Sequence, residues 1–402
     1  MKILLVHNYY QQPGGEDVVF AQERRLLEQK GHQVITYTRT NQEAAHTSLA
    51  GRVKLLKTIV SAEDSRQQVA SILDAEKPDL VHIHNTFMMI SPSIYTACWQ
   101  AQVPTVQTLH NYRLYCPAVT FYRDGHVCED CISGGLMQGV RHGCYRDSKL
   151  TTAAVAMMLK VHRSRETWTR RVNAFIALTE FSKRKFVDNG LPEDKVHVKP
   201  NFVDLNPERG EATGKYALFA GRLTPEKGIA TLLDAWRLLE KPLPLKIVGD
   251  GTSRSALESQ AQRDGLRDVE FLGWRDGEQT RDLMKRASFV VVPSLWYEGF
   301  PMVLAESFAC GVPVIASRLG AMEEIVAHGH TGLHFKPGSP EDLAQAVRWA
   351  LEHPESIAEM GWNARKQYEL RYTPEVNYAL LMEIYGKAMS RSWHQEEVAV
   401  QV

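Results

Sequence analysis

Short apolar runs alternate with helical patterns along the whole chain. The runs are rich in β-branched and aliphatic residues, and between them apolar residues recur with the spacing of an amphipathic helix. The runs occupy residues 3–6, 34–37, 80–83, 105–109 and 174–178 in the first half, and 216–220, 245–248, 269–272, 289–292 and 314–316 in the second. Such alternation is typical of βαβ units, so it predicts parallel sheets of the α/β class.

A polar, glycine-containing stretch at 206–214 separates the two series of runs. Its makeup is that of a connection between domains. We therefore predict two doubly wound, Rossmann-like domains at 1–203 and 204–373. Helical patterns end the chain, and the last of them, at about 374–390, can pack back on the first domain.

Polar residues directly follow the predicted strands. In open parallel sheets ligands bind beyond the carboxyl ends of the strands, so these residues are the first candidates for a site. They are His7, Asn8, His84, Asn85, His110, Asn111, Thr179 and Glu180 in the first half, and Arg222, Asp250 and Glu298 in the second. Two sheets with these edges facing each other would join both sets in one cleft.

The sharpest motif is Gly-Arg-Leu-Thr-Pro-Glu-Lys-Gly at 221–228, between a predicted strand and a helical pattern. Arg222 offers a planar fork of donors and Lys227 a point charge, and the glycines let a phosphate approach the backbone beside a helix start. A diphosphate needs this kind of fixed positive charge. The alternative is two solvated basic residues in a turn.

A second motif runs from Glu298 to Glu306, after the predicted strand at 289–292. Pro301 fits the first position of a helix, so Glu298 would lie in the loop before it and Glu306 two turns along. Carboxylates there can accept hydrogen bonds from sugar or ribose hydroxyls. The alternatives are complementarity to the helix dipole for Glu298 and an exposed helical position for Glu306.

These two motifs and the following Ala-Cys-Gly-Val-Pro-Val-Ile-Ala at 309–316 resemble the retaining glycosyltransferases of family 4, which have the GT-B architecture. The resemblance covers roughly the whole chain and is strongest over 216–340. It implies that Arg222 and Lys227 bind the donor diphosphate, Glu298 the donor sugar and Glu306 the ribose, with Trp274 near the base. The further donor-binding residues that it implies are Gly14, Gly15, Asp250, Gly299, Phe300 and Pro301.

The first half carries weaker signals. Gly14 and Gly15 follow the first strand, as the glycine loop of the family does, and His110 matches its active-site histidine. Taken alone, a plain Gly-Gly turn and a structural histidine are the commoner interpretations. His82 and His84 share one face of a strand, but no further ligand stands near them in the sequence, so we assign them no metal.

The resemblance implies sugar transfer with retention, by front-face attack of the acceptor as the diphosphate departs. His110, Arg222, Lys227 and Glu298 would be the catalytic residues. The chain contains no Asp-x-Asp element for a divalent metal on the diphosphate, so we expect the positive charges of Arg222 and Lys227 to serve instead and catalysis to need no cofactor.

Charge and hydropathy limit the partners. Lys plus Arg equals Asp plus Glu, at 47 each, so nothing indicates a nucleic acid. The apolar start is too short for a signal peptide, and no apolar stretch reaches the length of a membrane span, so we expect a cytoplasmic protein. A basic, partly amphipathic segment at 160–171 is either a solvated helix face or a peripheral contact with anionic lipid on the inner face of the membrane.

Four of the six cysteines fall in one loop-like region at about 112–148, and they are Cys116, Cys128, Cys131 and Cys144. In a reducing compartment this spacing favours a structural zinc site with four thiolate ligands, with unligated thiols as the alternative. The region follows His110, where it can shape the choice of acceptor.

The sequence thus predicts a hexosyltransferase that uses a nucleotide sugar and a saccharide or lipid-linked acceptor, in the synthesis of surface polysaccharide or envelope glycan. Alternatives on the same fold are a nucleotide-sugar 2-epimerase and an inactive sugar-nucleotide-binding protein. An NAD-dependent oxidoreductase is disfavoured, because no Gly-x-Gly-x-x-Gly follows the first strand. Neither the nucleotide, the sugar nor the acceptor is specified.

Overall fold

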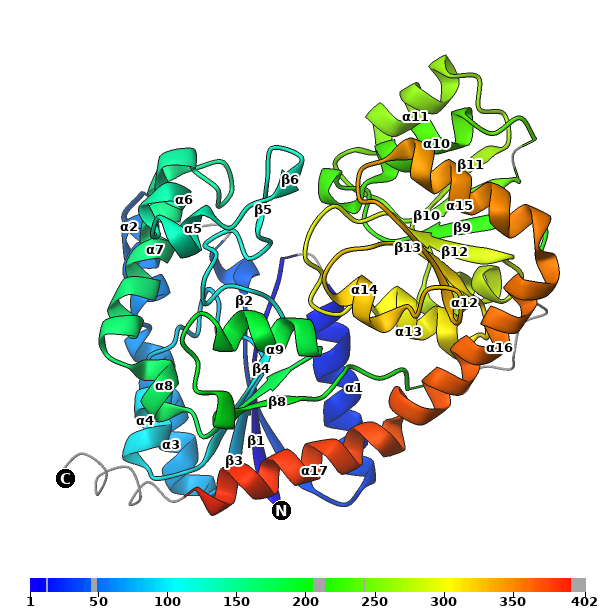
Figure 1. The fold of residues 1–402 in the computed structure, drawn as a ribbon. Coiled ribbons are helices and arrows are strands. Elements are labelled where there is room, and N and C mark those ends of the chain that lie inside the picture. The colour runs from blue at the N-terminus through cyan, green and yellow to red at the C-terminus, as the bar shows by residue number, and fades with distance from the viewer. Residues whose placement is uncertain (12–13, 45–48, 205–213, 242, 392–402) are drawn as a thin grey trace. The chain divides into compact units, whose positions relative to one another are not determined.

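The computed structural model describes residues 1–11, 14–44, 49–204, 214–241 and 243–391. The chain divides into two compact units (Figure 1). The first unit comprises Met1–Thr120, Glu129–Pro200 and Asn377–Val402, and the second comprises Phe121–Cys128 and Asn201–Val376. The predicted connection at 206–214 lies almost wholly outside the described residues. No helix in the described part of the chain is both long and apolar enough to cross a bilayer.

The first unit is built on a six-stranded parallel sheet in the order β2-β1-β3-β4-β7-β8. Its strands are β1 (Lys2–Tyr9), β2 (Gln33–Thr40), β3 (Leu80–Ile83), β4 (Thr105–Leu109), β7 (Ala174–Ala177) and β8 (Val196–Val198). Its helices are α1 (Gly15–Gln29), α2 (Leu49–Val60), α3 (Glu63–Glu76), α4 (Ile94–Gln100), α5 (Asp130–Ser133), α6 (Met137–His142), α7 (Lys149–Ser164), α8 (Thr167–Arg171), α9 (Glu180–Val187) and most of α17 (Pro374–Ser390).

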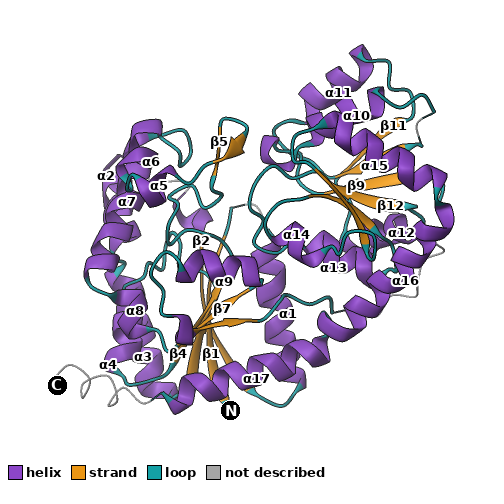
Figure 2. Ribbon diagram, in the orientation of Figure 1, coloured by secondary structure: helices purple, strands orange, loops and turns teal. Residues whose placement is uncertain are grey.

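The second unit holds another six-stranded parallel sheet, in the order β11-β10-β9-β12-β13-β14, with helices on both faces (Figure 2). Its strands are β9 (Ala217–Ala220), β10 (Leu245–Val248), β11 (Val269–Gly273), β12 (Phe289–Val292), β13 (Val314–Ser317) and β14 (Gly332–Phe335). Its helices are α10 (Ile229–Arg237), α11 (Arg254–Arg263), α12 (Gly277–Lys285), α13 (Met302–Ala309), α14 (Ala321–Ile325), α15 (Pro340–Glu352) and α16 (Pro354–Arg371). A small antiparallel hairpin, β5 (Tyr122–Arg123) and β6 (His126–Val127), also belongs to this unit.

The predicted fold class is confirmed, since each unit is a parallel α/β sheet of Rossmann-like form. Inner strands such as β3, β12 and β13 are buried on both faces, which is why they read as continuous apolar runs, whereas the edge strands β2 and β11 are partly exposed. The prediction missed β8, β14 and the β5–β6 hairpin, because these strands are short and each carries an arginine or a histidine.

The predicted end of the first strand was wrong. We expected the first strand to end before His7, but β1 continues to Tyr9, and the buried His7 and Asn8 pair with Thr38 and Arg39 of β2. Asn8 stays in the strand because its side chain is satisfied there: its Nδ2 donates to Oδ1 of Asn41, and its Oδ1 accepts from a backbone N–H in the loop after β3.

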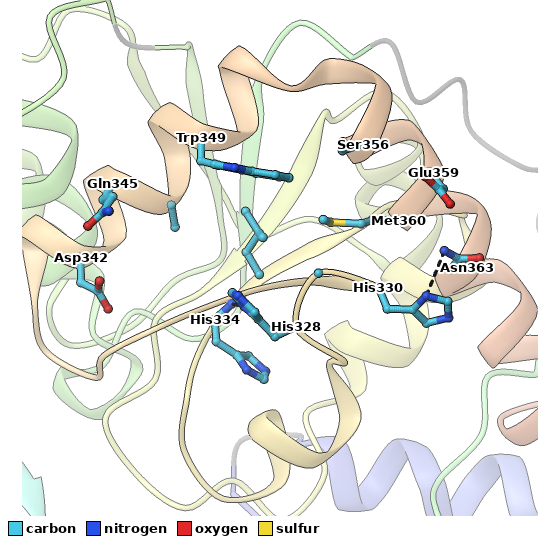
Figure 3. A pocket seen from close by; sticks show the side chains of 13 residues that line it. His328, His330, His334, Asp342, Gln345, Trp349, Ser356, Glu359, Met360 and Asn363 are labelled. Carbon is cyan, nitrogen blue, oxygen red and sulfur yellow. Dashed lines mark hydrogen bonds between the residues drawn. The ribbon is translucent and has the colours of Figure 1, made fainter.

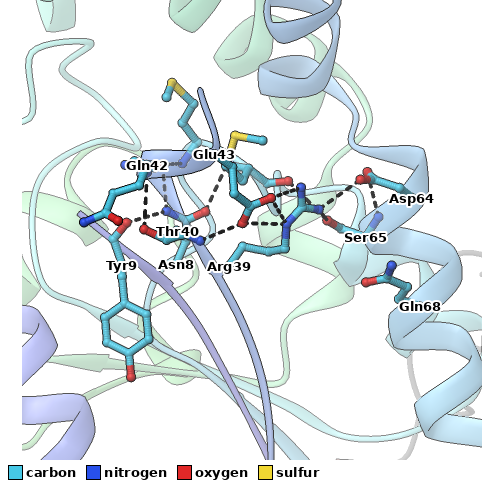
Figure 4. A network of polar contacts seen from close by, with 12 residues as sticks. Asn8, Tyr9, Arg39, Thr40, Gln42, Glu43, Asp64, Ser65 and Gln68 are labelled. Carbon is cyan, nitrogen blue, oxygen red and sulfur yellow. Dashed lines mark hydrogen bonds and ion pairs between the residues drawn. The ribbon is translucent and has the colours of Figure 1, made fainter. Parts of the chain in front are cut away.

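This polar network continues outward from Asn8 (Figure 4). Arg39 donates to the carboxylates of Glu43 and Asp64, and to the hydroxyl of Ser65. The network ties the carboxyl ends of β1 and β2 to the loop after β3. It therefore fixes the edge of the sheet from which His84 and Asn85 emerge.

Candidate functional site

The second sheet reverses its direction of growth between β9 and β12, which are neighbours although β10 and β11 lie between them in sequence. In open parallel sheets such a switch point, at the carboxyl ends of the strands, is where ligands bind. The loop that carries Arg222 and Lys227 follows β9, and the loop that carries Glu298 follows β12. The two strongest sequence motifs therefore flank the switch point.

Gly228 lets the backbones of these two loops pack closely against each other. Its φ is +71°, and a Cβ atom at this position would lie 2.0 Å from the carbonyl oxygen of Pro293, so only glycine fits. The backbone N–H of Leu295 donates to the carbonyl of Glu226 at 2.8 Å. The position of Lys227 is thus set by backbone contacts on both sides.

Lys227 and Glu298 meet at this point. The Lys227 Nζ donates to Oε1 of Glu298 at 2.6 Å, and the hydroxyl of Ser294 donates to the same oxygen at 2.8 Å. The Glu298 side chain is 7% exposed, so its charge needs this compensation. Water reaches Lys227 more freely, at 18% exposure, and its Nζ also lies 5.7 Å from the ring centre of Trp296.

Arg222 is exposed at the start of the same loop. The backbone around it is packed closely against the loop after β10, where a Cβ atom at Gly249 would lie 1.8 Å from the carbonyl oxygen of Gly221. The backbone N–H of Leu223 donates to the carbonyl of Asp250 at 2.9 Å. Arg222 therefore projects from a rigid turn.

Two predicted donor contacts, Asp250 and Trp274, occupy the same edge of the sheet. The side chain of Asp250 is exposed and pairs with Arg254 at 3.1 Å. Trp274 follows β11 and is 71% exposed, which leaves its face available for a base.

The segment after Glu298 leads into α13. Gly299, Phe300 and Pro301 precede the helix, which begins at Met302, so Pro301 caps it and is not its first residue as predicted. Glu306 lies within α13, where burial raises its pKa and the charge of Arg281 offsets part of the effect. Its neighbours Leu304, Ala305 and Phe308 are buried and apolar.

The first sheet has a switch point of its own, between β1 and β3. Gly14 caps α1 just after β1, its N–H donating to Asp17, and Gly15 is the first residue of the helix. Glu16 follows them and accepts from Asn111 at 2.6 Å. The predicted glycine loop is thus connected to the residue beside His110.

His110 ends the strand β4 and is 9% exposed. Its Nε2 lies 3.0 Å from Nδ1 of His84 at the end of β3. Burial lowers the pKa of His110 well below its ordinary value, and the neighbouring His84 adds to the effect. The ring is therefore neutral at physiological pH. It lines a small cavity with Asn85 and Asn111.

Sequence reasoning missed several residues of these sites. Ser294 fixes Glu298, and Glu23 of α1 lies against His82 and His84, forming a buried group of three potential metal ligands where we expected no third ligand. The sequence could have indicated Glu23, because it is a charged residue on the buried side of a helix, with Val19 and Leu27 on the same side.

The four cysteines belong to different units, with Cys128 in the second and the other three in the first. Cys131, Cys144 and the residue after Cys116 lie close to Gly139 of α6. A methyl group added there would lie 3.2 Å from Sγ of Cys131 and 3.3 Å from Pro117, which follows Cys116, and the N–H of Cys144 donates to the Gly139 carbonyl. The zinc site remains a prediction.

A pocket of about 550 Å³ lies elsewhere in the second unit. Figure 3 shows His328, His330 and His334 on one side and Trp349 on the other. His328 and His330 precede β14, so they lie at the opposite edge of the sheet from Lys227. We therefore do not assign the pocket to the donor.

Two family models match the chain. The model described as Glycosyl transferases group 1 matches residues 204–367, and the model described as Glycosyltransferase Family 4 matches residues 13–207. Their border falls at the division between the two units.

Curated relatives include an uncharacterised glycosyltransferase of Methanocaldococcus jannaschii, 32% identical over 45% of this chain and 52% of its own. A D-rhamnosyltransferase of Pseudomonas aeruginosa is 36% identical over 48% of this chain and 50% of its own. The aligned part thus spans about half the length of these relatives. A second M. jannaschii glycosyltransferase is 28% identical over 81% of both chains.

Solved structures share the fold. Anabaena HepE in complex with UDP superimposes with a TM-score of 0.68 and 21% identity, over 95% of this chain and 99% of its own. Sucrose-phosphate synthase of Thermosynechococcus elongatus gives a TM-score of 0.71 and 19% identity, over 97% and 100%. The architecture is that of GT-B proteins. Since the two family matches together run from residue 13 to residue 367, the chain belongs to the family 4 glycosyltransferases.

Proposed function

We propose that the chain transfers a hexose-type sugar from a nucleotide-diphosphate donor to a saccharide or lipid-linked saccharide, with retention of configuration. The observation that carries this proposal is the Lys227–Glu298 pair, held at a switch point by Gly228. HepE is solved with UDP-glucose, and one relative is a D-rhamnosyltransferase, which supports a nucleotide-sugar donor and a role in polysaccharide or envelope glycan synthesis.

In this proposal Lys227 and Arg222 neutralise the diphosphate, while Glu298 accepts hydrogen bonds from hydroxyls of the donor sugar. The bond between the anomeric carbon and the diphosphate oxygen breaks with its electron pair on the oxygen. The acceptor hydroxyl attacks the same face and gives its proton to the departing diphosphate. Because the charges are fixed before reaction, they stabilise the transition state without a metal on the diphosphate.

Glu306 and Trp274 complete the donor site. The raised pKa of Glu306 favours a carboxyl group that engages ribose hydroxyls in a dry environment. Trp274 offers an exposed aromatic face to the base.

Acceptor dependence tests the reaction class. Purified protein is incubated with UDP-, GDP- or ADP-sugars, with and without an extract of saccharide and lipid-linked acceptors, and release of nucleoside diphosphate is measured. A transferase releases it faster with acceptor. An epimerase would change the sugar at a rate that does not depend on acceptor, and an inactive binding protein would do neither.

We also propose a structural zinc held by Cys116, Cys128, Cys131 and Cys144, which would order the region beside the acceptor site. Zinc prefers such thiolates in structural sites. We expect about one zinc per chain in the purified protein, lost in Cys128→Ser, measured by elemental analysis. Cys98→Ser is the matched control and should keep the zinc, because Cys98 lies in α4, outside the cysteine-rich region. Absence of zinc from the wild type would remove the proposal.

A peripheral contact with anionic lipid through α7 and α8 is a further proposal. Arg163 and Arg171 donate to groups of the first unit, which leaves Lys160, Arg165 and the 53% exposed Met157 to meet a membrane. We expect retention on vesicles that contain anionic lipid at low salt and release at high salt. Equal recovery in the supernatant with and without vesicles would refute it.

A further inference from the structure

A chain of buried polar groups runs from the interior of the first unit to His110. The Nζ of Lys199 lies 2.9 Å from Oε2 of Glu23, and both side chains are 1% exposed. Oε1 of Glu23 lies 3.2 Å from Nε2 of His84, and Nδ1 of His84 lies 3.0 Å from Nε2 of His110. These polar contacts therefore link α1 to the ends of β3 and β4.

Lys199 determines the ionisation state of Glu23, at the inner end of this series of polar groups. Burial by itself would raise the pKa of Glu23, but the charges of Lys199 and His82 outweigh it and hold that pKa well below its usual range. Glu23 is thus a carboxylate. An ammonium this close to the carboxylate also argues against a metal on Glu23, His82 and His84, because two cations would then share one buried anion.

The carboxylate orients His84. Oε1 of Glu23 lies 3.0 Å from Nδ1 of His82 and 3.2 Å from Nε2 of His84, so the carboxylate faces both rings. Nε2 of His84 is buried and has no other hydrogen-bond partner in the described chain, so Glu23 is the charged group that it faces. Burial lowers the pKa of His84 to about 3, so the ring is neutral. A neutral ring that faces a carboxylate carries its proton on the facing nitrogen, Nε2. Its Nδ1 is then an acceptor.

The tautomer of His84 determines the tautomer of His110. Since Nδ1 of His84 can only accept, Nε2 of His110 must donate and carries the proton. His110 is itself neutral, so its Nδ1 has a free lone pair. The other titratable groups that act on His110 are His7 on β1 and His82 on β3, and Arg113 lines the same cavity.

We propose that Glu23 and His84 are positioning residues, which hold His110 neutral with its proton on Nε2 so that Nδ1 accepts a hydrogen bond from a hydroxyl of the sugar substrate. This inference rests on the proposed function for the identity of that substrate. The protonation state itself follows from the contacts within the first unit. A histidine of the opposite tautomer would offer an N–H where the hydroxyl must donate, as happens when the orienting partner of a catalytic histidine is changed.

Kinetics of two His84 variants test the role. His84→Phe fills the space without the polar contacts, and we expect it to lower kcat about ten- to a hundredfold while KM for the donor changes by less than about threefold. His84→Gln can donate to Glu23 and accept from His110 through one amide, so it should recover most of kcat. His162→Gln is the matched control, because His162 is as buried as His84 in the same unit but contacts Thr167 and the carbonyl of Val60, and should keep kcat.

Nitrogen NMR of the wild-type protein, labelled at histidine, tests the inference without turnover. We expect His110, assigned by comparison with His110→Gln, to be neutral and protonated on Nε2 from pH 6 to pH 8. A proton on Nδ1, or full kcat in His84→Phe, would overturn the proposal. Failure of the proposed function is distinguishable, because the wild type would then turn over no donor while the tautomer of His110 is still measured.

Discussion

We expect Lys227→Ala to lower sugar transfer by about a hundred- to a thousandfold, which is the usual cost of removing one fixed charge or donor from a developing oxyanion. In the structure Lys227 pairs with Glu298, so the variant loses the charge for the diphosphate and also removes the counter-charge from the Glu298 carboxylate, which keeps its hydrogen bond from Ser294. Both effects act on the same loop pair. Initial rates at saturating acceptor give the measurement.

Arg237→Ala is the control for this prediction. Arg237 is an exposed cation in the last turn of α10, away from the loop of Lys227. Its removal should leave the rate within about twofold of the wild type. A Lys227→Ala protein that keeps a third or more of the wild-type rate would show that this ammonium does not serve the leaving group.

Gly228→Ala has the largest expected effect on stability. The new Cβ would lie 2.0 Å from the Pro293 carbonyl oxygen, so the backbone of one loop has to move. We expect a loss of at least about 3 kcal/mol in the free energy of unfolding, since overpacking adds to the strain of a positive φ. Turnover should fall as well, because the same shift separates Lys227 from Glu298.

Gly265→Ala isolates the effect of packing. Gly265 has nearly the same φ, +68°, but nothing lies within 4 Å of its Cβ position. This substitution should therefore cost only about 1 kcal/mol, through backbone strain. Thermal unfolding of both variants compares them, with roughly 2–4 °C of Tm for each kcal/mol. Equal Tm values would mean that the loop around Gly228 yields easily and does not lock the site.

The second half of the chain is largely readable from its sequence. Most of its strands are continuous apolar runs, because both faces of each parallel strand are buried. The motif from Arg222 to Gly228 lies between a strand and a helix, where local sequence determines the loop. Short strands such as β14 lack this signal, since four residues with a histidine in the middle match no single period.

The contacts in the interior of the first unit cannot be predicted from local sequence patterns. Glu23 and Lys199 meet across 176 positions of the chain, and no local pattern encodes that contact. His110 and His84 were found as strand-end residues, but their relation depends on β3 and β4 being neighbours with matched register. Local patterns therefore single out strand-end residues as candidates, but they do not give the contacts between them.

Thermal unfolding of the wild type and of the Arg222→Ala, Lys227→Ala double variant, with and without UDP-, GDP- and ADP-sugars, tests the central claim most directly. A ligand stabilises only the state that binds it, by about 2.7 kcal/mol at a hundredfold excess over Kd. We predict that at least one nucleotide sugar raises the Tm of the wild type and leaves that of the double variant unchanged. An equal rise in both proteins would contradict the assignment of these two cations to the diphosphate.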